Sequence, residues 1–269
     1  MSWVRAGLVS LVALVVSLLL ARVHPFGDAG LLATDRKSEA LLGHSSVPPE
    51  VRAMLVNKCV DCHSTQTRLP VYDKVAARLA PLSWLIERDV VKGRKAMNLD
   101  QWDAYSADQQ ATFRAKMVQK TRSGEMPVLQ YRVVHWGSRV TDAEARALGE
   151  WAHEANKPDP GAVAQPGLEG DAARGEVVFN KRCTGCHSLT QDHEGPRLQG
   201  VYGRASGSVA GFNYSNSLRD AHVVWDDRLL ERWLEDPEAL VPGTNMDFRV
   251  VRPQERADLV RFLRASAGK

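Results

Sequence analysis

The sequence has little excess charge of either sign. Its 269 residues carry 35 Lys and Arg against 32 Asp and Glu, which gives a formal net charge of +3. No block of like charge stands out, so the composition argues against nucleic acid as a partner. Hydrophobic residues make up 44% and charged residues 25%, as is usual for a soluble globular chain. The length predicts about two domains.

Cysteine is also scarce, and all four cysteines fall in two copies of one pattern. Residues 59–63 read Cys-Val-Asp-Cys-His, and residues 183–187 read Cys-Thr-Gly-Cys-His. No thiol is left over for a disulfide or a nucleophile. The C-x-x-C-H pattern is the attachment signature of c-type haem, in which two thiols bond the porphyrin vinyl groups and the histidine ligates the iron.

A zinc site or a redox C-x-x-C pair is the alternative reading of these cysteines. Each pair is followed directly by a histidine, as haem attachment requires. The two pairs also lie far apart, in segments typical of separate domains, and this separation disfavours one shared tetrahedral zinc site. We therefore expect two covalently bound haem c groups. They would be held by Cys59, Cys62 and His63 in the first copy, and by Cys183, Cys186 and His187 in the second.

Long hydrophobic runs are absent except for one uncharged stretch, Ala6 to Ala21, with Arg5 before it and Arg22 after it. The stretch ends in Leu-Leu-Ala, which has a bulky residue where a signal-peptidase site needs a small one. An uncleaved signal-anchor over residues 1–22 is therefore favoured over a cleaved signal peptide. The positive charge before it directs the N-terminus to the cytoplasm of a bacterium and the remainder to the periplasm, where the thioether linkage is made.

No strand pattern is present, and the periodicity predicts an all-α chain. Ser106 with Gln109, and Thr141 with Glu144, have the spacing of capping boxes that open helices. A stretch rich in Pro and Gly marks the clearest domain boundary. After the transmembrane helix we expect two small helical haem domains, arranged as a tether at 23–46, a haem-binding domain at 47–155, a linker at 156–168 and a second haem domain at 169–269.

Several further motifs surround the second C-x-x-C-H. They are Gly-Pro-Arg-Leu at 195–198, Gly-Arg at 203–204, Gly-Phe-Asn-Tyr-Ser at 211–215, Trp225 and Pro-Gly-Thr-Asn-Met at 242–246. With these motifs, nearly all of residues 169–266 resembles class I cytochrome c of the mitochondrial and alphaproteobacterial type. The resemblance implies that Met246 is the distal iron ligand, opposite His187.

The resemblance also implies roles for residues around the second haem. The Pro196 carbonyl would accept a hydrogen bond from the His187 ring, and Thr244 would help to hold the Met246 loop. Haem propionates would be bound by Arg204, Tyr214 and Trp225. The first and last helices of the domain would pack through Gly175 and Phe179 on one side and Leu259 and Phe262 on the other.

Two features depart from the family. Trp233 stands where many members have a tyrosine near the methionine sulfur, which changes a hydrogen bond. Residues 168–269 carry 14 Lys and Arg against 15 Asp and Glu, so the lysine-rich face of the eukaryotic members is missing. An acidic partner is therefore not implied.

The first domain resembles a family of haem-binding domains found in bacterial exported proteins, over about residues 48–154. The shared features include Pro-Val-Tyr at 70–72, Pro-Leu-Ser-Trp at 81–84, Gly93-Arg94, Asn98, Trp102, Met126-Pro127 and His135. For the sixth ligand of the first haem, Met126 is favoured because it lies in a loop after Gly124. Met97 and His135 are alternatives, as is an open position, while Met54 and Met117 lie on helical patterns typical of the core.

Together these features predict a membrane-tethered dihaem cytochrome c that transfers single electrons between respiratory-chain partners. The expected donor is a quinol-oxidising complex or a dehydrogenase, and the expected acceptor is a terminal oxidase or reductase. An electron carrier of this kind is not an enzyme. The alternative is a dihaem peroxidase, in which the first haem has an open position. A haem-based sensor is a third possibility, although the sequence carries no transmitter domain.

Overall fold

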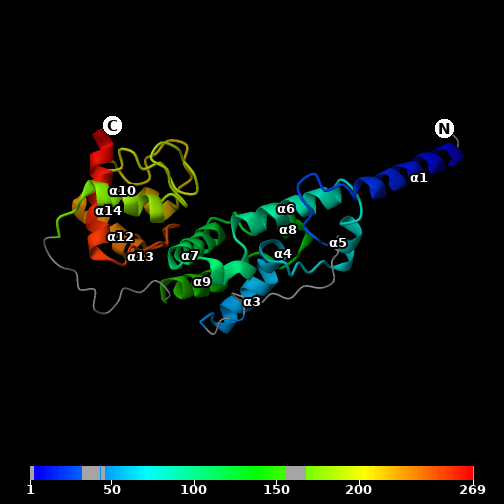
Figure 1. Cartoon of the computed structure of the whole chain (residues 1–269), viewed down its shortest axis with the longest axis horizontal. Coiled ribbons are helices and arrows are strands. Elements are labelled where there is room, and N and C mark those ends of the chain that lie inside the picture. Colours follow the sequence, from blue (N-terminus) through cyan, green and yellow to red (C-terminus); the bar gives the residue numbers. More distant parts are fainter. Residues whose placement is uncertain (1–2, 32–42, 44–45, 155–167, 269) are drawn as a thin grey trace. The chain divides into compact units, whose positions relative to one another are not determined.

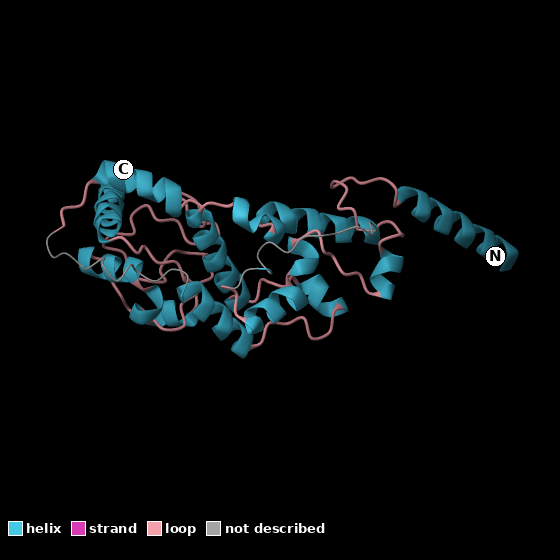
Figure 2. Cartoon of the chain, turned by 60° about the horizontal axis from the view of Figure 1, so that its bottom comes forward, coloured by secondary structure: helices cyan, strands magenta, loops and turns pink. Residues whose placement is uncertain are grey.

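The computed structural model describes residues 3–31, 43, 46–154 and 168–268. Within these ranges the regular structure is helical, and the sole β interaction is an isolated bridge between Ala205 and Val224 (Figure 2). The prediction of an all-α fold is therefore confirmed. Contacts along the chain divide it into two compact units, Met1–Ala104 and Tyr105–Lys269.

The first unit begins with α1 (Trp3–Leu20), none of whose side chains is buried. Eighteen residues make a helix about 27 Å long. Among the described residues, α1 is the one helix long and apolar enough to cross a membrane. The remaining helices of this unit are α3 (Pro49–Lys58), α4 (Val60–His63), α5 (Val71–Ala76), α6 (Leu82–Ala96) and the 3-10 helix η1 (Leu99–Ala104) (Figure 1).

The segment that follows α1 lies against α6. The Trp84 indole N–H donates to the carbonyl of Val23 at 2.9 Å, and Arg94 Nη1 donates to the carbonyl of Ala29 at 2.8 Å. Ala29 and Leu31 are buried in a small core with Val90 of α6. Most other residues of the predicted tether at 23–46, and nearly all of the predicted linker at 156–168, lie outside the described residues.

The second unit starts with α7 (Ala107–Arg122), α8 (Leu129–Val134) and α9 (Asp142–Glu154). Ser106 and Gln109 form the expected capping box at the start of α7. At α9, Thr141 Oγ1 accepts from the N–H of Glu144 at 3.3 Å, while the Glu144 carboxylate accepts from the N–H of Thr141 at 2.8 Å. Both predicted capping boxes are confirmed.

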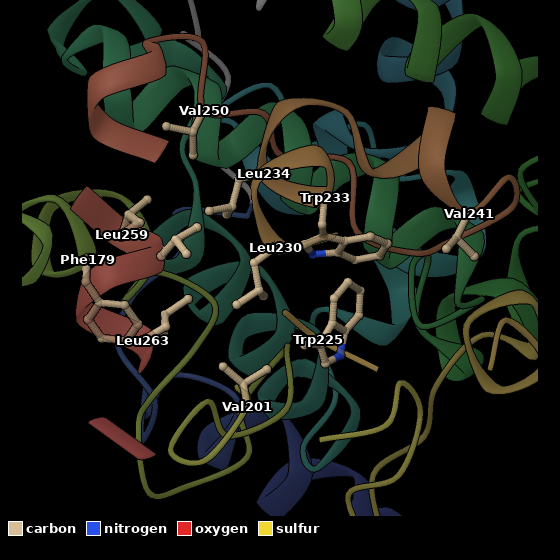
Figure 3. Close-up of a cluster of buried hydrophobic side chains, with 11 residues drawn as sticks. Phe179, Val201, Trp225, Leu230, Trp233, Leu234, Val241, Val250, Leu259 and Leu263 are labelled. Carbon is tan, nitrogen blue, oxygen red and sulfur yellow. The ribbon is translucent and has the colours of Figure 1, made fainter. Parts of the chain in front are cut away.

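The same unit continues with helices that surround one hydrophobic core. They are α10 (Ala172–Arg182), α11 (Asn216–Asp220), α12 (Asp227–Glu235), α13 (Pro237–Leu240), α14 (Pro253–Ala265) and the 3-10 helix η2 (Ser266–Gly268). Side chains of α10, α12 and α14 converge on the core, with Trp225 and Trp233 facing each other (Figure 3). Their ring centroids are 5.2 Å apart.

Helices α10 and α14 are in close contact at Gly175. A Cβ at this position would lie 2.6 Å from the carbonyl carbon of Asp258 and 2.7 Å from Cβ of Phe262. The rings of Phe179 and Phe262 pack beside this contact with centroids 5.3 Å apart. The predicted packing of the first and last helices is confirmed, and glycine is what permits the backbones to approach so closely.

Candidate haem sites

The second C-x-x-C-H forms a tight turn at the end of α10. Cys183 N–H donates to the carbonyl of Phe179 at 2.8 Å, which continues the helix. The N–H groups of Cys186 and His187 then donate to the carbonyl of Cys183, at 3.0 Å and 2.8 Å. The turn directs both thiols and the imidazole to one cavity, which all three side chains line.

The His187 ring is fixed from two sides. Its Nδ1 lies 2.8 Å from the carbonyl of Pro196, so Nδ1 donates and Nε2 keeps its lone pair. A Cβ at Gly195 would lie 2.6 Å from Nε2 of His187, which leaves room for glycine alone beside the ring. Burial lowers the pKa of His187 and outweighs the opposing hydrogen bond to Pro196. The neutral ring is the form that ligates a metal.

Met246 lines the same cavity, in the loop between α13 and α14. The indole N–H of Trp233 donates to Met246 Sδ at 3.2 Å, and the N–H of Met246 donates to Thr244 Oγ1 at 3.4 Å. Thr244 is buried. The structure thus brings His187, Met246 and Thr244 to one cavity, as the family resemblance implies.

The substitution Trp233→Phe is expected to lower the reduction potential of the second haem by about 20–60 mV. The N–H donor withdraws electron density from the sulfur and favours reduced iron, and its loss removes one hydrogen bond worth about 0.5–1.5 kcal/mol. Spectroscopic redox titration of the two proteins measures the shift. Phe212→Leu, at another residue that lines the cavity, is the control, and an equal shift there would contradict a specific role for the indole.

The walls of this cavity are mainly apolar, and the polar residues predicted to bind propionates lie among them. Arg204, Tyr214 and Trp225 all line the cavity. Arg204 donates to the carbonyls of Gln199 at 3.1 Å and Arg197 at 2.9 Å, which orients its guanidinium. Burial raises the pKa of Tyr214 and keeps its hydroxyl protonated as a donor. These groups can neutralise and hydrogen-bond buried carboxylates.

Helix α7 supplies part of the same cavity. Thr112, Ala115, Lys116 and Gln119 line it beside Cys186. Ion pairs join this helix to the rest of the unit, with Asp108 2.7 Å from Lys181 and 2.9 Å from Arg182. At the other end of α7, Arg122 donates to the carbonyl of Thr244 at 3.0 Å. No sequence motif indicated that α7 would contact the Met246 loop.

The first C-x-x-C-H has the same turn. Cys59 N–H donates to the carbonyl of Leu55 at 3.0 Å, and the N–H groups of Cys62 and His63 donate to the carbonyl of Cys59, at 3.2 Å and 3.0 Å. His63 Nδ1 lies 3.0 Å from the carbonyl of Met97. Met97 therefore orients His63 as Pro196 orients His187, a role that the sequence did not reveal.

Helix α6 packs against the first C-x-x-C-H turn. A Cβ at Gly93 would lie 2.5 Å from the carbonyl oxygen of Cys62, so the helix and the turn can meet only at a glycine. The adjacent Arg94 Nε donates to the carbonyl of Ser64 at 2.8 Å and so closes the end of the turn. Gly93 and Arg94 belong to the motifs shared with haem-binding domains, and the structure supplies a physical reason for both.

Burial favours the protonated form of Cys62, Cys183 and Cys186. It raises the pKa of Cys183 to about 12, and that of Cys62 to about 12 with a further contribution from Asp61 and Asp89. Burial also raises the pKa of Cys186. The paired thiols of each turn would form the thioether bonds to one haem.

Two of the candidate distal ligands of the first haem, Met126 and His135, lie in the second unit. Met126 is 37% exposed, and its N–H donates to the carbonyl of Lys120 at 3.0 Å. His135 Nδ1 lies 3.1 Å from the carbonyl of Tyr131, and the two rings stack. Met54 and Met117 are buried, as their helical patterns predict. The assignment of Met126 as the sixth ligand stays a prediction.

Comparisons with known proteins agree with these two sites. Residues 24–154 match the family described as "Haem-binding domain", and residues 172–267 match "Cytochrome c". Cytochrome c of Euglena viridis is 42% identical over 98 residues, which cover 35% of this chain and 96% of that protein. Cytochrome c2 of Rhodomicrobium vannielii is 40% identical over 104 residues, which cover 37% and 82%.

Among solved structures, cytochrome cH from Methylobacterium extorquens is 37% identical and covers 36% of this chain and 99% of its own chain, with a TM-score of 0.34.

Proposed function

Because this chain belongs to the cytochrome c family, we propose that it is a membrane-tethered dihaem cytochrome that passes single electrons between respiratory partners in the bacterial periplasm. Its family and its haem-binding domain establish the coarser statement, that it is an electron-transfer cytochrome carrying covalent haem c. The observation that carries the proposal is the pair of matching turns, each with a histidine held through Nδ1.

The protein's part at the second site is to hold two ligands still. His187 is fixed by Pro196 and Gly195, and Met246 by Trp233 and Thr244. When bound, haem c supplies reversible one-electron chemistry at its iron. If His187 and Met246 both ligate the iron, no position would remain for oxygen or peroxide, and His/Met ligation would raise the potential above that of bis-His.

The wall of the second site would keep water from the iron. The cavity is bounded by the buried core that holds Trp225, Leu230 and Leu259, and a dry, apolar shell favours the less charged, reduced state. At the propionates, Arg204, Tyr214 and Trp225 would supply the positive charge and donors that buried carboxylates require. Each protein group therefore has a role in holding the haem or in setting its potential.

The first C-x-x-C-H site would hold the other haem of the proposed pair. Cys59 and Cys62 would form the thioether bonds, and His63, oriented by Met97, would ligate the iron. Burial lowers the pKa of His63 and leaves the ring neutral. Met126 would complete the ligand set and make this site a second electron carrier.

Membrane attachment would come from α1, with its N-terminus in the cytoplasm. Its 18 residues bear no buried side chain, and a helix of this length comes close to spanning a hydrocarbon core. A tether of this kind raises the local concentration of the haem domains near membrane-bound partners. The donor would be a quinol-oxidising complex or a dehydrogenase, and the acceptor a terminal oxidase or reductase.

The haem count tests this proposal directly. The purified full chain is expected to contain two covalent haems, measured by pyridine haemochrome absorbance against protein mass. The double variant Cys59→Ala/Cys62→Ala should keep one haem, and so should Cys183→Ala/Cys186→Ala, because each turn binds its haem independently. Loss of both haems in either variant, or one haem in the wild type, would contradict the dihaem assignment.

The same preparations separate a carrier from a peroxidase. An electron carrier should have two low-spin irons and reduce hydrogen peroxide no faster than free solution chemistry does. A high-spin iron that persists in Cys183→Ala/Cys186→Ala, together with rapid peroxide reduction by the wild type, would instead establish the dihaem peroxidase with its open position at the first haem.

A further inference from the structure

Three side chains of metal-ligand type meet in the first unit, away from either C-x-x-C-H turn. His24 and Asp28 come from the segment after α1, and Glu87 comes from α6. One ligand atom from each lies within 4.8 Å of the others. We propose that His24, Asp28 and Glu87 bind one divalent transition-metal ion of the zinc type.

Glu87 provides the independent sign of a ligand. Its side chain is only 5% exposed. Oε1 lies 2.6 Å from His24 Nδ1, whereas Oε2 is buried and has no hydrogen-bond partner among the described residues. A buried carboxylate oxygen without a donor is costly, and native structures satisfy such atoms with protein, water or an ion. A cation between the three residues would satisfy it.

The other two ligands are held where they are needed. The Trp84 indole N–H donates to the carbonyl of Val23 at 2.9 Å, next to His24. Asp28 Oδ1 accepts from the N–H of Gly30 at 2.6 Å, which fixes its carboxylate. His24 and Asp28 both face solvent, whereas Glu87 is buried. Small movements of the two exposed side chains can therefore bring all three ligands around one ion.

The donor set selects the ion. One imidazole nitrogen and two carboxylate oxygens are ligands that Zn²⁺ accepts at about 2.0–2.2 Å, with water in the fourth position. Ca²⁺ and Mg²⁺ prefer oxygen alone. Two carboxylates and a neutral imidazole also balance the charge of a divalent cation. On binding, the ion would take the place of the hydrogen between Nδ1 of His24 and Glu87. That hydrogen would leave to solvent as a proton, and the neutral ring would carry its single proton on Nε2.

Such an ion would connect the segment after α1 to α6. Helix α6 also carries Gly93, which contacts the first C-x-x-C-H turn. The metal would thus fix the start of the haem-binding domain where the chain leaves α1, and it takes no part in electron transfer itself.

Zinc binding to the haem-loaded full chain tests this site. After treatment with a chelator, the protein is dialysed against ZnCl₂ in competition with a chromophoric chelator, and bound zinc is measured by mass spectrometry. We expect one zinc ion per chain. His24→Ala, Asp28→Asn and Glu87→Gln should each weaken binding at least tenfold. X-ray absorption at the zinc edge should show one imidazole nitrogen with oxygen neighbours and no sulfur.

The controls separate this site from general surface binding. His222 and Glu50 are exposed and lie outside the cluster. The control variants His222→Asn and Glu50→Gln should therefore leave zinc binding unchanged. Asp28 is exposed, so Asp28→Asn tests the site even if Glu87→Gln fails to fold. Absence of stoichiometric zinc in the wild type, or equal binding by the three cluster variants and the wild type, would overturn the proposal.

Discussion

Met246→Ala is expected to lower the reduction potential of the second haem by about 0.1–0.3 V, well within the roughly 0.8 V range that axial ligands span. The thioether sulfur stabilises reduced iron, and alanine offers no ligand. Trp233 and Thr244 hold this residue in place. Without Met246 the iron would have one protein ligand fewer.

Redox titration with absorption spectra measures this effect for each haem separately. The sulfur-to-iron charge-transfer band of the second haem should disappear, and the iron should bind added imidazole. Met126→Ala is the matched control at the other loop methionine. It should leave the second haem unchanged and, if Met126 ligates the first iron, lower only the first potential. An unaltered second potential in Met246→Ala would refute the assigned ligand.

Gly175→Ala is expected to destabilise the second unit by about 3 kcal/mol, at the upper end of the cost of overpacking. The added Cβ would lie 2.6 Å from the carbonyl carbon of Asp258 and 2.7 Å from Cβ of Phe262. Backbone is the main obstacle, and backbone cannot rotate away as a side chain can. Helices α10 and α14 would have to separate, which loosens the packing of Phe179 and Leu259.

Denaturant unfolding followed by haem absorbance and tryptophan fluorescence measures this cost. Glu176→Ala, one residue further along α10 on the exposed side, is the control and should change the free energy of unfolding by less than about 0.5 kcal/mol. If Gly175→Ala lowers the free energy of unfolding no more than Glu176→Ala does, then the two helices can adjust to the added Cβ, and the close contact at Gly175 does not limit stability.

The attachment chemistry could be predicted because it is local. Two thiols and an imidazole spaced within five residues share one helical turn wherever that turn lies, so the hydrogen bonds from Cys186 and His187 to the carbonyl of Cys183 follow from the pattern. Capping boxes are local in the same way, and both formed as expected. The all-helical class followed from periodicity, which depends on neighbours a few residues apart.

Contacts between distant residues needed the folded chain. The carbonyl of Met97 lies beside His63, 34 residues away in the sequence. Every residue has a backbone carbonyl, so the residue type at position 97 could not indicate this contact. The sequence indicates Met97 only as a possible sulfur ligand, whereas in the structure its backbone carbonyl lies beside the histidine ring. The contact of Arg122 with Thr244 spans 122 residues and depends on how α7 packs.

The sequence by itself determined that this chain carries two C-x-x-C-H turns of the kind that attach haem c, that it is helical, and that its second domain resembles class I cytochrome c. These properties reside in short spacings and in residue types that few other chemistries require. Tertiary structure alone decided that the Met97 carbonyl orients His63, that Gly93 lies against Cys62 and Gly195 against His187, and that Trp233 donates to the Met246 sulfur. Those contacts depend on shape and burial, which arise only when separate helices pack together.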